Sequence, residues 1–174
     1  MAATFDWQED NGTATGSPAK GTTRTTGRTE VNWKNQDDST TVYNTVPVTA
    51  GNNSFTKFQF GKFSGTFTTI SAGLFAHTSG TLGAGLTLVS NVTSTYTTPG
   101  TSTLTGTDIT SAISIGSGAT VLFVATGPET ASPGSSCSTN PCYTQFLQTQ
   151  IQTTVAASPG DSATVTFTLQ YQEH

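Results

Sequence analysis

Few side chains of this chain could perform acid–base chemistry. His77 is the one internal histidine, and Asp108, Glu129 and Asp161 are carboxylates of the second half of the sequence. Two such carboxylates could serve a glycosidase, which places a carboxyl group on each side of the bond that it cleaves. No zinc-protease, P-loop, serine-hydrolase or dinucleotide-binding motif accompanies them. We therefore expect no catalytic residues, no metal, no cofactor and no enzymatic activity.

The two cysteines, Cys137 and Cys142, lie close together in the segment CSTNPCY. Two cysteines without a nearby histidine cannot complete a four-ligand zinc site. The spacing leaves two interpretations open. Either the thiols are free in a polar loop, or they close a small disulfide loop once the protein meets an oxidising medium.

The composition favours strands and a nearly neutral surface. Thr makes up about one residue in five, and charged residues make up only 9% of the chain, against roughly 25% in an average soluble domain. A net charge of −4 and a pI near 4.8 argue against a nucleic-acid partner, which requires a basic face. No apolar run approaches the roughly 20 residues of a membrane helix, and the first residues do not resemble a signal peptide. We expect synthesis in a cytoplasm and no membrane partner.

The sequence predicts a polar N-terminal arm followed by a β domain, which would position the side chains discussed above. Residues 1–28 lack apolar periodicity and predict an extended N-terminal arm, with Phe5 and Trp7 as its anchor. Residues 29–174 predict an all-β domain, a two-sheet antiparallel sandwich of the jelly-roll or Greek-key kind. The expected strands are 29–35, 40–48, 55–67, 68–80, 82–90, 119–127, 144–155 and 162–172, with one short helical turn within 104–115. Among these, 119–127 is an unbroken apolar run typical of a central strand that is buried on both faces.

Half of the 10 phenylalanines lie in one stretch, FTKFQFGKFSGTF. Strict alternation places Phe58 and Phe60 on one face of a strand and Phe55, Phe63 and Phe67 on the other. The sandwich interior covers one face, and the arm, a loop or a partner subunit must cover the other. Phe55, Phe63 and Phe67 are therefore candidates for an assembly face.

The basic residues end at Lys62, although acidic residues continue to the end of the chain. Lys20, Arg24 and Arg28 are spaced four apart along the expected arm. One interpretation is chance clustering in a chain with few charges. The other is that these three residues dock on an acidic protein surface through charge-assisted hydrogen bonds.

The order of several segments resembles a known class of protein. These segments are VNWKN, VPVTAGNNSFTKFQFGKFSGTFTTIS, LFAHTSG and YTTPG. Over residues 29 to about 127 the pattern is similar to small β-sandwich virion proteins of tailed bacteriophages, the capsid decoration or cement proteins. The resemblance implies a structural protein of the capsid surface that binds the major capsid protein and stabilises the head. It also implies a homo-oligomer, with a trimer favoured, a terminal arm that adds contacts, and no catalytic residues.

A second hypothesis is a carbohydrate-binding or host-surface-binding module, including one in a phage tail or fibre. Aromatic side chains such as Trp33 and Tyr96 could offer faces on which sugars stack. The segment TDITSAI also resembles the part that precedes a core strand in jelly-roll carbohydrate-binding modules. A glycan signal that depends on these aromatic residues would favour this alternative.

Overall fold

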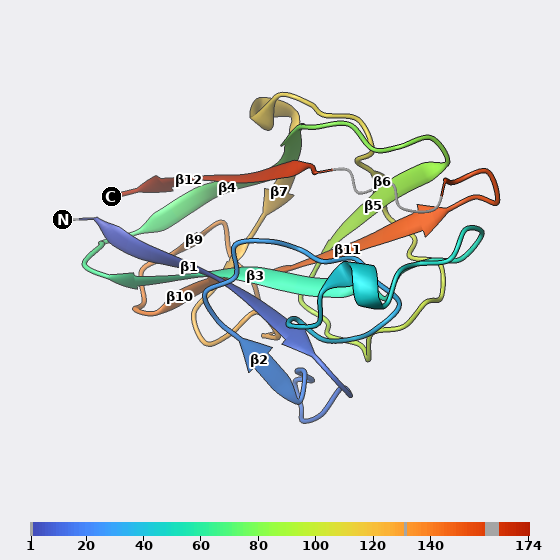
Figure 1. The fold of residues 1–174 in the computed structure, drawn as a ribbon. Coiled ribbons are helices and arrows are strands. Elements are labelled where there is room, and N and C mark those ends of the chain that lie inside the picture. Colours follow the sequence, from blue (N-terminus) through green and yellow to red (C-terminus); the bar gives the residue numbers. More distant parts are fainter. Residues whose placement is uncertain (1, 131, 159–163) are drawn as a thin grey trace.

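The computed structural model describes residues 2–130, 132–158 and 164–174, which form two antiparallel β-sheets (Figure 1). The prediction of an all-β, two-sheet antiparallel sandwich is confirmed. The spatial order in the larger sheet is β2 (Thr23–Thr25), β1 (Ala3–Asn11), β3 (Lys57–Gly65), β11 (Phe146–Thr153), β5 (Leu86–Thr93) and β6 (Thr107–Asp108). Two short strands extend this sheet, because β10 (Cys142–Thr144) pairs with both β3 and β8 (Phe123–Val124).

The smaller sheet has the order β12 (Thr166–Glu173), β4 (Ile70–Ser79) and β7 (Ala119–Val121), and β9 (Ser136–Cys137) also pairs with β4. Two short 3₁₀ turns, η1 (Tyr43–Thr45) and η2 (Ile115–Ser117), lie in the connections. In the part of the chain that the structure describes, no helix has the length and apolar character needed to span a membrane.

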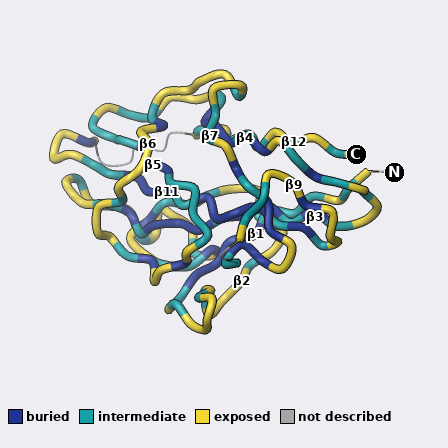
Figure 2. Tube along the Cα trace, turned by 180° about the vertical axis from the view of Figure 1, so that it is seen from behind, coloured by how far each residue is buried: buried dark blue, intermediate teal, exposed yellow. Residues whose placement is uncertain are grey.

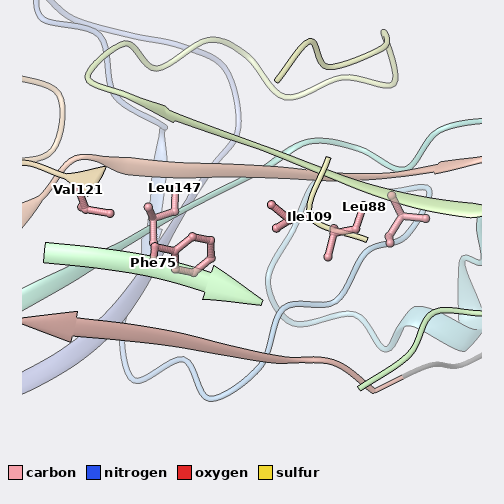
Figure 3. Close-up of a cluster of buried hydrophobic side chains, with 6 residues drawn as sticks. Phe75, Leu88, Ile109, Val121 and Leu147 are labelled. Atoms are coloured by element: carbon pink, nitrogen blue, oxygen red, sulfur yellow. The ribbon is translucent and has the colours of Figure 1, made fainter. Parts of the chain in front are cut away.

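The core lies between the two sheets. One cluster joins Phe75 of β4 and Val121 of β7 to Leu88, Leu147 and Ile109 from the side of the larger sheet (Figure 3). A second cluster also draws on both sheets, with Phe63, Ile70, Phe123, Cys137 and Cys142. In Figure 2 the buried stretches follow the strands of the larger sheet, and the exposed ones lie mostly in the peripheral loops.

β3 carries buried aromatic side chains on both of its faces, as the alternation predicts. Phe63 points into the cluster between the sheets, whereas Phe58 and Phe60 pack with Tyr96 and Phe146 in a third cluster. Each of the three phenylalanines of β3 is 0% exposed. The third cluster is covered by residues of the same chain, since Tyr96 comes from a loop after β5.

The expected N-terminal arm is wrong for residues 3–11. They form β1, which pairs with β3 in an unbroken antiparallel register from Ala3↔Gly65 to Asp10↔Phe58. β2 then pairs with the other edge of β1. Because β1 is an internal strand of the larger sheet, the expected boundary at residue 28 does not separate an arm from a domain.

The strands expected at 29–35 and 40–48 are also wrong. Both segments are irregular apart from η1. Between them, the carboxylate of Asp38 accepts hydrogen bonds from the backbone N–H groups of Thr40 (2.8 Å) and Thr41 (2.6 Å). Such local side-chain bonds satisfy backbone donors that a strand ladder would otherwise use, and so they favour a turn.

Two further expectations change in detail. The apolar run 119–127 is not one central strand, since its residues 119–121 belong to the smaller sheet as β7 and residues 123–124 belong to the larger sheet as β8. The run is apolar because it crosses the core between the sheets.

The helical turn expected within 104–115 is replaced by β6, where Asp108 accepts a hydrogen bond from the backbone N–H of Thr110 (2.8 Å), and η2 begins only at Ile115.

Candidate functional site

The two residues expected to anchor an arm are part of the packed domain. The centre of the Phe5 ring lies 5.1 Å from the ring centres of Trp7 and Phe63, and 6.2 Å from that of Tyr171 in β12. Phe5 therefore joins the larger sheet to the smaller one. Trp7 packs against the main core cluster. Both side chains are therefore packed against residues of their own chain.

Arg24 is also paired within its own chain. Its guanidinium donates to both carboxylate oxygens of the buried Asp10 (2.7 and 2.8 Å) and more weakly to Glu129 (3.3 Å). It also lies 4.6 Å from the centre of the Phe60 ring. Arg24 was expected to dock on an acidic protein surface. The carboxylates that it binds belong to its own chain, namely Asp10 of β1 and Glu129.

The other two basic residues of the expected docking set differ from Arg24. Lys20 is exposed, and its backbone pairs with Thr15 in an isolated β-bridge. Arg28 is half-buried, and its backbone N–H donates to the carbonyl of Trp7 (2.9 Å). Of these three basic residues, only Arg24 forms an ion pair within the described part of the chain.

The candidate assembly face is wrong for Phe63. That residue lies between the two sheets and has no exposed surface. Phe55 and Phe67 are half-buried, and Phe67 packs against the cluster that contains Phe63. The chain itself covers most of this face, so no partner subunit is needed to bury it.

A polar network that the sequence did not reveal lies where β1 and β3 run side by side. We call Glu9, Asn11, Ser39 and Lys57 the β1 polar network; they are 1%, 4%, 4% and 0% exposed. The Lys57 ammonium contacts the Glu9 carboxylate (3.4 Å) and donates to the carbonyl of Asp38 (2.8 Å). Burying charged and amide groups is costly unless they are paired, and this network pairs them with one another.

The Glu9 carboxylate is the centre of this network. Its Oε1 atom accepts hydrogen bonds from Asn11 Nδ2 (3.0 Å) and Ser39 Oγ (3.1 Å), and its Oε2 atom accepts one from Gln59 Nε2 (3.0 Å). Asn11 Oδ1 also lies within hydrogen-bond distance of Ser39 Oγ, so the single hydroxyl proton of Ser39 is shared between Glu9 Oε1 and Asn11 Oδ1. The sequence did carry one signal of the network, namely a lysine directly before Phe58, the first buried phenylalanine of β3.

A second buried lysine lies beside the network. Lys34 Nζ contacts the Asp38 carboxylate at 2.8 Å, and the lysine is 0% exposed. Partial burial by itself raises the pKa of Asp38, but the hydrogen bonds from Lys34 and from the backbone of Thr41 and Thr40 outweigh it. The pKa of Asp38 therefore lies well below its usual value.

The two cysteines are free thiols and both are buried. Cys142 belongs to the larger sheet and Cys137 to the smaller one, and both side chains lie in the same core cluster. Burial, followed by the hydrogen bond with the Cys137 thiol, raises the pKa of Cys142. Of the two interpretations left open, the structure has the free thiols, although the cysteines lie in the strands that flank the exposed polar loop 138–140 and not in the loop itself.

Among the described residues, the two carboxylates that could have formed an acid–base site, Asp108 and Glu129, are not assembled into one. Asp108 is exposed in β6, whereas Glu129 contacts Arg24 of β2, and β6 and β2 are the opposite ends of the larger sheet. Asp161 lies outside the described residues. His77 is buried, and its two ring nitrogens lie 2.8 Å from the carbonyl oxygen of Ile109 and 2.9 Å from that of Ser79. In the described residues, therefore, no two of these carboxylates come together.

Two of the aromatic residues considered for sugar stacking, Tyr96 and Trp33, are engaged in the fold, whereas Tyr43 is exposed. Tyr96 is 2% exposed and donates its hydroxyl to the carbonyl of Gly12 (2.8 Å). Trp33 is half-buried against Phe167, and its Nε1 donates to Thr149 (3.1 Å). A separate surface cavity of about 320 Å³ is lined mainly by polar residues, namely Asn35, Val48, Thr49, Gly51, Asn52, Asn53 and Thr101.

β12 presents a long free strand edge. Within the described residues, β12 pairs with β4 and with no other strand. Its register with β4 shifts twice, and each time the additional residue is in β4, so β12 itself stays regular. Its side chains at Thr166, Gln170 and Gln172 are exposed and uncharged. An unprotected edge of this kind presents backbone groups that can pair with another strand.

Comparisons of the chain with protein-family models, curated proteins and solved structures give no match, so the geometry described above is what bears on function.

Proposed function

We propose that this chain is a structural virion protein that binds the major capsid protein on the outer capsid surface and stabilises the head. The resemblance over residues 29 to about 127 supports this proposal. The observation that carries it is the free edge of β12. A capsid-surface protein needs a rigid body with a surface available to its partner, and this edge offers one.

The β12 edge suits strand addition, in which a segment of a partner extends a sheet. Its main-chain groups would supply the affinity, and its neighbouring side chains would supply the selectivity. Soluble proteins often protect such edges with lysine, proline or a bulge. β12 contains no lysine or proline, and the bulges lie on β4 instead. We propose that the partner strand comes from the major capsid protein and that the bound form is a homo-oligomer, with a trimer favoured.

Capsids prepared without this protein provide the test. Purified protein is added, the particles are sedimented, and the bound fraction and the heat resistance of the particles are measured. We expect binding and greater heat resistance with the natural sequence. Particles that neither bind the protein nor gain resistance would refute the capsid role.

A matched pair of variants tests the β12 edge. The Gln170→Lys variant places a charge on the edge and should lower the bound fraction strongly. The Thr105→Lys variant places the same charge on an exposed loop residue and should bind normally. Equal binding of both variants would leave the capsid role standing and show that another surface makes the contact.

A glycan-binding module is the second candidate, because the polar cavity described above presents three asparagine side chains. Amides of this kind can hydrogen-bond sugar hydroxyl groups. A glycan array provides the test, since a signal that is lost with Asn52→Ala would favour this function. The absence of any signal with the natural sequence would exclude it for the glycans on the array.

A further inference from the structure

The β1 polar network contains the parts of an amide-transfer reaction. An amine and a primary amide are buried together, and one carboxylate oxygen contacts both of them. Glu9 Oε1 lies 3.4 Å from Lys57 Nζ and 3.0 Å from Asn11 Nδ2. A purely structural ion pair would need the lysine and the carboxylate, but it would not need the amide at the same oxygen.

The strand register explains why these groups meet. β1 and β3 are antiparallel and pair up to Asp10↔Phe58, so continuing the same register places Asn11 opposite Lys57. Side chains that face each other across two antiparallel strands have Cβ atoms roughly 5 Å apart. Glu9 lies two residues before Asn11 on β1 and therefore points to the same face of the sheet. The pairing of β1 with β3 therefore brings the side chains of Glu9, Asn11 and Lys57 together.

The surroundings favour attack by the lysine. Burial lowers the pKa of Lys57, the Lys34 charge lowers it further, and the carboxylates of Glu9 and Asp37 only partly oppose these effects. A larger share of the amine is then neutral and nucleophilic, as in other desolvated reactive lysines. The carbonyl of Asp38 accepts a hydrogen bond from Nζ (2.8 Å) and holds the amine in place.

The amide of Asn11 is polarised from both ends. Ser39 Oγ donates to its Oδ1 atom, where negative charge would develop during attack on Cγ. Its Nδ2 atom donates to Glu9 and to Asp37 (2.9 Å), so a proton acceptor and donor is already in contact with the leaving group. Ser39 and Glu9 thus have the roles of an oxyanion donor and a general acid–base.

We propose that Lys57 and Asn11 form an intramolecular isopeptide bond with Glu9 as the catalytic residue. The neutral Lys57 amine attacks Cγ of Asn11, and the new Nζ–Cγ bond forms. The Cγ–Nδ2 bond then breaks. One proton passes from Nζ through the Glu9 carboxylate to Nδ2, which leaves as ammonia. The reaction needs no oxidant and no cofactor, and it does not depend on the proposed capsid role.

The bond would tie β1 to β3 covalently inside the core. It would close a loop from residue 11 to residue 57 that includes β2 and η1. Closing a long loop restricts the unfolded chain and therefore stabilises the folded one. The N-terminal strand could then not detach from the sheet without breaking a covalent bond.

Intact-mass spectrometry of the purified, denatured protein gives a direct test. We expect a mass lower than the sequence mass by one ammonia molecule. Trypsin cannot cleave after an acylated lysine, so digestion should yield residues 1–20 joined to residues 35–62 as one cross-linked peptide. A protein with the full sequence mass, carrying no such peptide, would overturn the proposal.

Three variants separate this bond from other losses of ammonia. Asn11 precedes Gly12, and a succinimide at Asn-Gly would cause the same mass change without a cross-link. Lys57→Arg and Glu9→Gln should both restore the full mass, whereas the control Lys62→Arg should keep the reduced mass. A reduced mass that persists in Lys57→Arg would assign the loss to the succinimide and refute the cross-link. If a variant does not fold, the cross-linked peptide of the natural sequence still decides the question.

Discussion

Replacing Phe5 with alanine should destabilise the isolated protein, with no partner present. The Phe5 ring contacts Trp7, Phe63 and Tyr171, and so it bridges the two sheets. A fully buried Phe→Ala substitution costs about 3–5 kcal/mol. Phe5 is half-buried, which reduces the expected loss to about 2–3 kcal/mol by area. For a domain of this size, the melting temperature should fall by about 4–12 °C.

Urea and thermal unfolding of the monomer, followed by circular dichroism, would measure this loss. Thr4→Ala is the matched control, because Thr4 is the exposed neighbour on the same strand. Its stability should stay within about 0.5 kcal/mol of the natural protein. If Phe5→Ala unfolds like the control, then β1 is not packed in the isolated chain. The N-terminal residues would in that case be an arm that docks only on a partner.

Three other substitutions test contacts of the same region. Gly61→Ala would place a methyl group 2.5 Å from the Phe5 ring, so unfolding should show a loss of about 1–3 kcal/mol that shrinks in the Phe5→Ala background. Tyr96→Phe removes the hydroxyl bond to Gly12 and should cost about 1 kcal/mol in urea unfolding, and no loss would contradict that bond. The lowered pKa of Asp38 contributes stability that is present above the unfolded pKa of about 4 and is lost as the pH falls towards the folded value. Between about pH 5 and about pH 3, the free energy of unfolding of Asp38→Asn, measured with urea, should therefore fall less than that of the natural protein. An equal fall in both proteins would show that other groups cause the pH dependence.

Strands whose apolar residues alternate could be predicted from the sequence. In β12 and at Val165 directly before it, partly buried Val165, Phe167 and Leu169 alternate with threonine and glutamine, and the inward face matches the pattern. The two faces of β3 could also be predicted, because Phe58 and Phe60 are two residues apart, whereas Phe63 is an odd number of residues from both and so falls on the other face. These elements are specified by local pattern, and the core that they form follows from it.

β1 could not be predicted in this way, because its sequence ATFDWQEDN carries three acidic residues. Two of them, Glu9 and Asp10, are buried beside Lys57 and Arg24, which lie 48 and 14 residues further along the chain. Only the folded sheet brings these opposite charges together. A segment can therefore read as a polar arm and still be an internal strand.

The course of residues 26–56, which are largely irregular apart from η1, could not be predicted for a related reason. Val31 and Trp33 alternate like residues of a strand, but Trp33 packs on Phe167 of β12 and bonds to Thr149 of β11. Its position is set by two strands from the far end of the chain. The β1 polar network could not be predicted either, since Ser39 and Lys57 meet Glu9 only after β1 and β3 have paired.

The two described ends of the chain lie side by side (Figure 1), and the backbone N–H of Ala3 donates to the carboxylate of Glu173 (2.8 Å). A short linker could therefore join them, and the chain could be reopened in the connection between β4 and β5, where Gly80 and Thr81 are exposed. In such a circular permutant β12 would precede β1 in the sequence, with both sheets kept. The order of the strands along the chain could thus change while their arrangement in space is kept. A second protein fused to either end of the present chain would be attached at the same corner of the molecule.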